Sequence, residues 1–408
     1  MKISIITYGL TGWGGGIDLI RKFASSLGSK SIGQKNYLIS PSRDFEHHTR
    51  NILYPLREIT RQIFDRRPIK WVKRPSIFSK VLSGLMDEFQ SDLNIIYGGS
   101  SFSAQVKTAI EHKADVIFPC VYVPLKYKNK IPWIGYIIDF QHFYYPHFFS
   151  EGELKQRDKI CAGMLRDASH IVTNSQDTIN DIKKLYPETL AKLHSLPFCP
   201  FPEKEWLNAK LDVREKYNIS FEYFIISNQF WTHKDHETAF RAYEIYQGSG
   251  GKAKLVCTGS TTDFRSPQHF HRLKQLLLDL GIADSVYILG HIPKIDQIAL
   301  LKNSLGLIQP TLFEGGPGGG SSYDAISIGV PVIASNISIN LEMNFGRVDF
   351  FNSADFIDLS KKMQSLELSG YISMTPEELW DIGNENKKRC GQFLFKVAQE
   401  CIHDFKKK

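Results

Sequence analysis

The stretch from Gln309 to Asn340 constrains the fold most, because it joins two buried-strand patterns through a turn rich in glycine. It reads QPTLFEGGPGGGSSYDAISIGVPVIASNISIN. The apolar run Leu305–Pro310 predicts one strand and Val330–Ser335 predicts the next, with a helix around Ala325–Ile328 between them. A strand, a glycine turn, a helix and a second buried strand are typical of an α/β domain with a parallel sheet.

The glycine turn is suited to an anion, because residues without a Cβ let backbone N–H groups close around it. A helix N-terminus that follows such a turn binds phosphate. Two carboxylates, Glu314 and Asp324, flank the turn and could hold sugar hydroxyls on either side of a diphosphate. The alternative is a tight α/β corner without a ligand, since such motifs occur by chance. The predicted phosphate contacts are Gly318, Gly319, Gly320, Ser321 and Ser322.

Length and composition favour an ordinary globular protein of two or three domains, with 408 residues, 42% hydrophobic and 23% charged. We find no apolar run of about 20 residues that could span a bilayer, and MKISIITYGLTGWGGG at the start reads as a strand and a turn rather than a signal peptide. The six cysteines lack metal-ligand spacing, which indicates reduced core residues in the cytosol and no structural zinc. The net charge of +7 fits an anionic substrate or membrane, and no nucleic-acid motif is present.

The first half alternates strands and helices. A strand over Lys2–Tyr8, a glycine turn over Gly9–Gly16 and a helix from Ile17 precede further strands at Leu93–Tyr97, Asp115–Tyr122 and Trp133–Ile138. The N-terminal turn could face a ligand or be a simple corner, and it lacks the clean spacing of a dinucleotide site. Residues 57–74 are basic and aromatic, which predicts contact with an anionic membrane surface. The alternative for them is a solvated loop with an amphipathic helix.

The segment Asp139–Phe149 follows a predicted strand, where α/β sheets place their ligands. We therefore expect His142 to contact the reacting sugar, although a structural histidine is nearly as good an interpretation. The proline-rich Leu193–Pro202 predicts a linker. The expected domains are residues 1–200 and 201–384, with a tail helix over about 385–408 that packs back on the first domain.

The second half repeats the alternation, with strands predicted at Glu222–Ser227, Lys252–Thr258 and Ser285–Leu289 before the opening stretch. The loop Asn228–His236 follows the first of these strands. Lys234 in this loop could reach a diphosphate as a point charge, although a lone lysine is more often simply exposed.

In this order the pieces resemble retaining glycosyltransferases of the GT-B fold, specifically glycosyltransferase family 4. The segments PWIGYIIDFQHFYYPHFFS, SNQFWTHKDHETAF and FEGGPGGGSSYDAISIGVPVIASNI look like bacterial enzymes that build O-antigen or capsule. The resemblance implies an α/β protein with two Rossmann-like, doubly wound parallel sheets that face each other across a cleft. The acceptor would bind the first domain and the nucleotide sugar the second.

The resemblance also implies roles for individual residues. Glu314 matches the carboxylate that contacts the donor sugar, and Asp324 matches the one that holds the ribose, with a spacing two residues wider than usual. Lys234 matches the diphosphate lysine, but its usual arginine partner falls on Gln229, so one positive charge is missing. Three further regions are matched or proposed for the donor. Asn228 lies in the donor loop, and His291 and Ile292 lie where the family's backbone contacts the nucleotide base. Gly15 and Gly16 match the N-terminal loop that faces the phosphates and the acceptor. The family's His-Asp pair aligns with Ile138 and Asp139, which leaves His142 as the nearest replacement.

The implied reaction moves a sugar from a nucleotide-diphospho sugar to a hydroxyl of a glycan acceptor, which we expect to be lipid-linked. The candidate catalytic residues are His142, Asp139, Lys234 and Glu314. No Asp-x-Asp motif is apparent, so we expect neither a metal nor another cofactor. The expected location is the cytoplasm, with peripheral attachment to the inner face of the membrane. Two alternatives of the same fold remain, a sugar-nucleotide epimerase and a non-catalytic nucleotide-sugar-binding protein.

Overall fold

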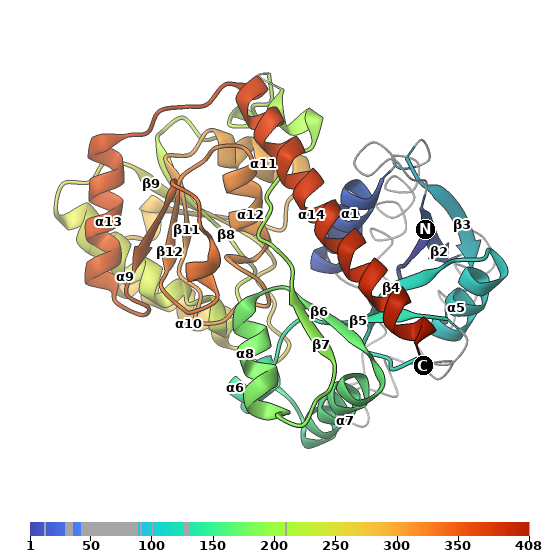
Figure 1. Cartoon of the computed structure of the whole chain (residues 1–408). Coiled ribbons are helices and arrows are strands. Elements are labelled where there is room, and N and C mark those ends of the chain that lie inside the picture. The colour runs from blue at the N-terminus through green and yellow to red at the C-terminus, as the bar shows by residue number, and fades with distance from the viewer. Residues whose placement is uncertain are drawn as a thin grey trace.

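The computed structural model describes residues 1–11, 14–28, 36–41, 89, 92–99, 101–125, 131–208 and 210–407. Two α/β lobes lie side by side, and one long helix crosses between them (Figure 1). The segment 57–74, predicted to contact a membrane, lies outside the described residues. None of the described helices is both long and apolar enough to cross a bilayer.

The first lobe contains a parallel sheet of seven strands in the order β3-β2-β1-β4-β5-β6-β7. Its central strands are fully buried and apolar, as expected for a sheet covered on both faces. The strands are β1 (Ile3–Ile6), β2 (Tyr37–Pro41), β3 (Asn94–Gly98), β4 (Val116–Val121), β5 (Trp133–Ile137), β6 (His170–Thr173) and β7 (Lys192–Ser195). The helices are α1 (Gly14–Leu27), α5 (Phe102–Glu111), α6 (Gln141–Tyr144), α7 (Glu151–Asp167) and α8 (Gln176–Leu185).

The second lobe contains a parallel sheet of six strands in the order β10-β9-β8-β11-β12-β13. The strands are β8 (Tyr223–Ser227), β9 (Lys254–Thr258), β10 (Val286–Gly290), β11 (Gly306–Gln309), β12 (Val332–Ser335) and β13 (Val348–Phe351). The helices are α9 (His236–Gly248), α10 (His269–Asp279), α11 (Lys294–Lys302), α12 (Gly319–Ser327) and α13 (Phe356–Ser369). The predicted pair of doubly wound parallel sheets is therefore confirmed.

The strand order reverses once in each sheet, between β1 and β4 in the first and between β8 and β11 in the second. Open α/β sheets bind ligands at such switch points, outside the carboxyl ends of the strands. The chain leaves β11 directly into the glycine turn and leaves β8 directly into the loop that contains Lys234. The topology thus brings the two predicted donor-binding segments to one edge of the second sheet.

The last helix, α14 (Pro376–Lys406), starts in the second lobe and ends on the first (Figure 1). Thr375 and Glu378 form a capping box at its start, with Pro376 in the first helical position. Its buried side chains belong to the same core as β1 and β4: Cys390, Leu394, Val397, Ala398 and Cys401. The predicted linker Leu193–Pro202 begins inside β7, so its first residues are strand and only the rest is irregular.

A chain of polar contacts fastens α14 to the edge of the first sheet. His170 Nδ1 lies 2.9 Å from His194 Nε2, and His170 Nε2 lies 3.1 Å from Asp404 Oδ2, which also accepts from Lys192 Nζ at 2.7 Å. The two rings are 10° from parallel with centroids 5.1 Å apart, as expected for an in-line N–H···N hydrogen bond. Among the described residues, His170, His194 and Glu400 are also close enough together to form a potential metal group. Both ring nitrogens of His170 are engaged, however, one with His194 and the other with Asp404.

We predict that acid loosens this attachment. Burial, followed by repulsion from His170, lowers the pKa of His194 from 6.5 to about 4. Between these values the unfolded chain binds more protons than the folded one, so stability falls as the pH drops from 6.5 towards 4. Because His194 is partly exposed, its contribution to this loss in the free energy of unfolding is on the order of 1 kcal/mol. Melting temperatures at pH 7.5 and 5.0 should differ less in His194→Gln than in the parent, whereas exposed His271→Gln should behave like the parent. Equal pH dependence in both variants would contradict this role.

Candidate active site

The carboxyl edges of the two sheets meet at the glycine turn. Asn174, just after β6 in the first lobe, donates from Nδ2 to the backbone oxygen of Gly315 at 2.7 Å. A Cβ at Gly316 would lie 3.3 Å from Asn174 Cβ, and one at Gly315 would lie 3.0 Å from Asp139 Oδ2. The absence of side chains in this turn therefore lets the two lobes approach closely.

Lys234 and Glu314 form a nearly buried ion pair at this edge. Lys234 Nζ lies 2.5 Å from Glu314 Oε1, and the two side chains are 12% and 7% exposed. Gln309, the last residue of β11, donates from Nε2 to the same oxygen at 3.1 Å. Asn228 donates in turn to the side-chain oxygen of Gln309. The lysine thus points into the glycine turn rather than into solvent.

The helix after the turn, predicted around Ala325–Ile328, begins earlier in the structure, at Gly319. Gly318 precedes it with φ +64° and provides no side-chain cap, and Gly319 has φ +64° as well. The N–H of Gly318 donates to Asn340 Oδ1 at 3.0 Å and that of Gly319 to the backbone oxygen of Gly316 at 3.0 Å. Two of the backbone donors predicted for a diphosphate therefore already have partners within the turn.

The N-terminus of α12 holds the Glu314 carboxylate in this structure. A Cβ at Gly319 would lie 2.8 Å from Glu314 Oε2, so the carboxylate lies against the first helical residue. A negative charge is stabilised there by the helix dipole. The hydroxyls of Ser321 and Ser322, in the first turn, are buried and have no hydrogen-bond partner among the described residues. Because buried polar groups are normally satisfied, these two hydroxyls keep an unused capacity to bind a further polar group.

Asp324, the expected ribose contact, is buried in the middle of α12 and is paired with a lysine that the sequence analysis did not assign. Lys294 Nζ, at the start of α11, lies 2.5 Å from Asp324 Oδ2 and 3.9 Å from Asp18 Oδ2 of α1. Burial raises the pKa of Asp324 to about 6, although Lys294 opposes this. Gly15 and Gly16 lie in the first turn of α1, and the contact of Asp18 with Lys294 places this end of the helix against the second lobe.

The loop after β5 meets the second lobe through residues other than His142. The ring of His142 is buried within the first lobe, with Nε2 3.3 Å from Asp158 Oδ1 and the ring 4.6 Å from that of Phe143. Gln141 instead reaches across, with Nε2 3.4 Å from His233 Nε2. Asp139 accepts from the backbone N–H of Gln141 at 3.0 Å and lies beside Gly315. In this arrangement His142 does not face the turn, because its aromatic neighbours and Asp158 hold it inside the first lobe.

The remaining predicted residues lie at the same edge with different exposure. Gln229 is exposed, and its backbone oxygen accepts from the N–H of Trp231. His291 is exposed just after β10, whereas Ile292 is buried in the core of the second lobe. Gly320 has an open surrounding, with Asp18 Oδ2 3.9 Å from a Cβ placed there.

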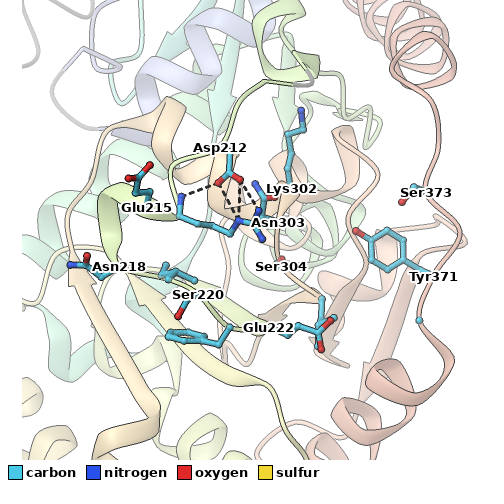
Figure 2. Close-up of a pocket in the computed structure, with 15 residues that line it drawn as sticks. Asp212, Glu215, Asn218, Ser220, Glu222, Lys302, Asn303, Ser304, Tyr371 and Ser373 are labelled. Carbon is cyan, nitrogen blue, oxygen red and sulfur yellow. Dashed lines mark hydrogen bonds and ion pairs between the residues drawn. The ribbon is translucent and has the colours of Figure 1, made fainter.

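A surface hollow of about 1180 Å³ lies elsewhere (Figure 2). Its wall includes Glu222 and Leu305, which precede β8 and β11, so it opens at the amino ends of these strands. Asp212 and Arg214 on this wall pair with each other at 2.8 Å. Parallel sheets bind their ligands at the opposite ends of the strands, and we therefore place the candidate site at the glycine turn.

Three residues of the site were missed in the sequence: Gln309, Lys294 and Arg265. Gln309 and Lys294 both come at or soon after the carboxyl end of a strand, and that position was the available signal. Arg265 follows β9 by a longer loop, and its guanidinium lies at the interface with the first lobe, where Nη1 donates to Gln141 Oε1 at 3.4 Å. No local pattern predicts that contact, because it depends on the arrangement of two lobes.

Comparison with known proteins identifies the architecture. Residues 210–370 match the family model of the glycosyl transferases group 1. Sucrose-phosphate synthase from Thermosynechococcus elongatus is 14% identical, with a TM-score of 0.58 over 98% of this chain and 97% of that one. HepE from Anabaena, solved with UDP-glucose, is 12% identical with a TM-score of 0.58 over 100% of both chains. The lipopolysaccharide outer core galactosyltransferase WaaB, in its apo form, is 15% identical with a TM-score of 0.54 over 98% and 99%.

At these identities the structural likeness shows the fold, and the predicted GT-B fold is confirmed. A comparison with curated protein sequences gives no match.

We predict that Gly319→Ala destabilises the protein by about 1–3 kcal/mol, because an alanine is strained at a left-handed φ. Its Cβ would also displace the Glu314 carboxylate. Gly346→Ala is the matched control, since a Cβ there meets nothing within 4 Å and its φ is not in the left-handed region. Urea unfolding of both variants gives the free energies. Equal stability of the two variants would show that the turn does not require glycine at 319.

Proposed function

We propose that this protein is a retaining glycosyltransferase of family 4 that transfers a sugar from a nucleotide-diphospho sugar to a hydroxyl of a glycan. The observation that carries the proposal is the Lys234–Glu314 pair at the N-terminus of α12, beside two buried serine hydroxyls without partners. A lysine, a helix N-terminus and free hydroxyls form a site for phosphate. The match of residues 210–370 to the group 1 glycosyl transferases supports the same activity.

In the proposed mechanism the donor diphosphate takes the place that the Glu314 carboxylate occupies at α12. Lys234 and the serine hydroxyls would then bind phosphate oxygens. The carboxylate would turn to the hydroxyls of the donor sugar, the role that its family match implies. As the bond to the anomeric carbon breaks, negative charge grows on the leaving phosphate, and preorganised donors lower the barrier by stabilising it.

The acceptor is proposed to bind the first lobe, beside Asp139 and Gln141, with its hydroxyl delivering a proton to the leaving phosphate on the same face of the sugar. Gln141 takes over the position that the sequence assigned to His142, since it is the residue that reaches the second lobe. Glu342 of the second lobe accepts from the N–H groups of Gln176 and Asp177 at 2.9 and 2.8 Å, at the start of α8. Such contacts close the lobes together, which excludes water that would hydrolyse the donor.

For the acceptor we propose a lipid-linked glycan of bacterial surface polysaccharide synthesis, handled at the cytoplasmic face of the membrane. The support is the fold shared with WaaB, a lipopolysaccharide galactosyltransferase, together with the motifs of the O-antigen and capsule type. HepE binds UDP-glucose, so UDP-sugars are the first donors to test. A thermal-shift screen with UDP-, GDP- and dTDP-sugars identifies the donor, because a ligand bound only to the folded state raises its stability.

We predict that Lys234→Ala and Glu314→Ala each lower sugar transfer by about 10²–10³-fold, because each removes a group that stabilises the transition state. The measurement is release of nucleoside diphosphate in the presence of acceptor, with circular dichroism to confirm folding. Lys155→Ala, an exposed lysine on α7, is the control and should keep full activity. Near-normal turnover in both site variants would refute the assignment. Donor binding without turnover across a panel of acceptors would favour a binding protein, and an altered free sugar nucleotide would favour an epimerase.

We predict that transfer continues unchanged in excess EDTA and that the product keeps the anomeric configuration of the donor. In this proposal fixed charges such as Lys234, rather than Mg²⁺, balance the leaving diphosphate. Proton NMR of the first-formed product gives its configuration, and parallel rates with and without EDTA test the metal. A loss of rate that added Mg²⁺ restores would contradict metal independence, and an inverted product would contradict the retaining assignment.

A further inference from the structure

Arg265, on the loop between β9 and α10, buries a guanidinium at the interface between the lobes. Its side chain is 8% exposed, and Nε donates to Asp263 Oδ1 at 3.3 Å. Nη1 donates to Gln141 Oε1 of the first lobe at 3.4 Å. Nη2 is buried and has no hydrogen-bond partner among the described residues. Since a buried charged donor without an acceptor is costly, this nitrogen indicates an acceptor that the described residues do not supply.

The surroundings of Arg265 come from both lobes. The guanidinium lies over the ring of Phe148 from the first lobe at 4.8 Å and over that of Trp231 from the second at 4.9 Å. Asp263 and Trp231 stay with Arg265 when the lobes separate, whereas Phe148 and Gln141 leave it. Separation of the lobes would therefore expose one side of the guanidinium to solvent, while Asp263 and Trp231 keep it in place. Closure of the lobes would bury that side again.

His233 connects Arg265 with the predicted diphosphate lysine. Burial lowers the pKa of His233 to about 2, with further lowering by the charges of Lys234 and Arg265, so the ring is neutral. Arg265 and His233 both contact the ring of Phe148, at 4.8 Å for the guanidinium and 5.9 Å between the ring centroids, and Lys234 is the next residue after His233. The backbone oxygen of His233 accepts from the N–H of Leu312 at 2.8 Å, two residues before Glu314. Arg265, Lys234 and Glu314 thus belong to one region at the carboxyl edge of β9, β8 and β11, which are neighbours in the sheet.

The family arginine is missing from this region, because Gln229 stands at its position and is exposed and neutral. We infer that Arg265 supplies the second positive charge of the donor-phosphate site, in place of an arginine at position 229. A phosphate oxygen would replace the amide oxygen of Gln141 on Nη1 and satisfy Nη2, in the paired geometry that guanidinium favours. This inference rests on the proposed function, since it assigns a residue to the donor site of that reaction.

Calorimetry with the parent protein first shows which of UDP, GDP and dTDP it binds. The test then compares the affinity of each variant for that diphosphate with its affinity for the corresponding nucleoside. Arg265→Met should weaken the diphosphate by about 10–100-fold, the usual worth of a charged hydrogen-bonded contact, and leave the nucleoside unchanged. Arg265→Lys keeps the charge but loses the paired geometry, so its affinity for the diphosphate should lie between those of the parent and Arg265→Met. Arg214→Met, on the opposite face of the second lobe, is the matched control and should bind like the parent.

Rescue separates a binding role from a structural one. Adding Gln229→Arg to Arg265→Met should restore most of the lost affinity for the diphosphate, because it returns a cation to the family position. Unchanged diphosphate affinity in Arg265→Met would overturn the inference, as would an equal loss for nucleoside and diphosphate or a failure of Gln229→Arg to restore binding. If Arg265→Met does not fold, the same test uses Arg265→Lys. A lower diphosphate affinity in that variant, restored by Gln229→Arg, would then support the inference, and an unchanged affinity would overturn it. Failure of the parent to bind any nucleoside diphosphate would instead refute the proposed function.

Discussion

The site depends on the buried ion pair between Lys234 and Glu314, which is favourable only because polar groups surround it. Removing Lys234 and Glu314 from water costs more than their attraction returns unless further groups satisfy them. The side-chain amide of Gln309 and the dipole of α12 provide that support. Gln309 also donates to the backbone oxygen of Gly318 at 2.6 Å, so the same side chain shapes the turn. The carboxylate is thereby held at the position that the proposed function assigns to a donor phosphate.

The domain arrangement follows from two crossings of the chain between the lobes. One follows β7, and the other is α14, whose final turns are part of the core of the first sheet. Any separation of the lobes must pivot at these crossings. The contacts that join the lobes at the glycine turn, such as Asn174 with Gly315 and Glu342 with the start of α8, involve neither crossing. Opening at the glycine turn is thus compatible with an intact core in each lobe.

The sequence predicted the parts of this molecule that depend on neighbouring residues. Apolar runs that alternate with helical spacing predicted both sheets. Lys234 was proposed because it follows a strand end and Glu314 because it flanks the glycine turn, and the structure places the two side chains in contact. Three features needed the tertiary structure. The start of α12 moved to Gly319 because Asn340, a distant residue, holds the N–H of Gly318. His142 lies inside the first lobe because Asp158 of α7 contacts its ring nitrogen and the rings of Phe143 and Phe149 pack against it. Lys294 and Arg265 matter through contacts with Asp324 and with the opposite lobe, which no local spacing encodes.

Each cation at this edge of the second sheet is paired with a carboxylate: Lys234 with Glu314, Lys294 with Asp324 and Arg265 with Asp263. Under the proposed function, a diphosphate would therefore compete for cations that are already engaged. Such competition would couple binding of the diphosphate to binding of the donor sugar, because a carboxylate that loses its cation becomes an acceptor for sugar hydroxyls. Glu314 is the carboxylate best placed for this exchange, since its cation comes from a loop and its own turn consists mostly of glycine. Asp324 differs, because it is fixed in the middle of a helix and burial already raises its pKa to about 6. Phosphate binding would accordingly free Glu314 and leave Asp324 with Lys294.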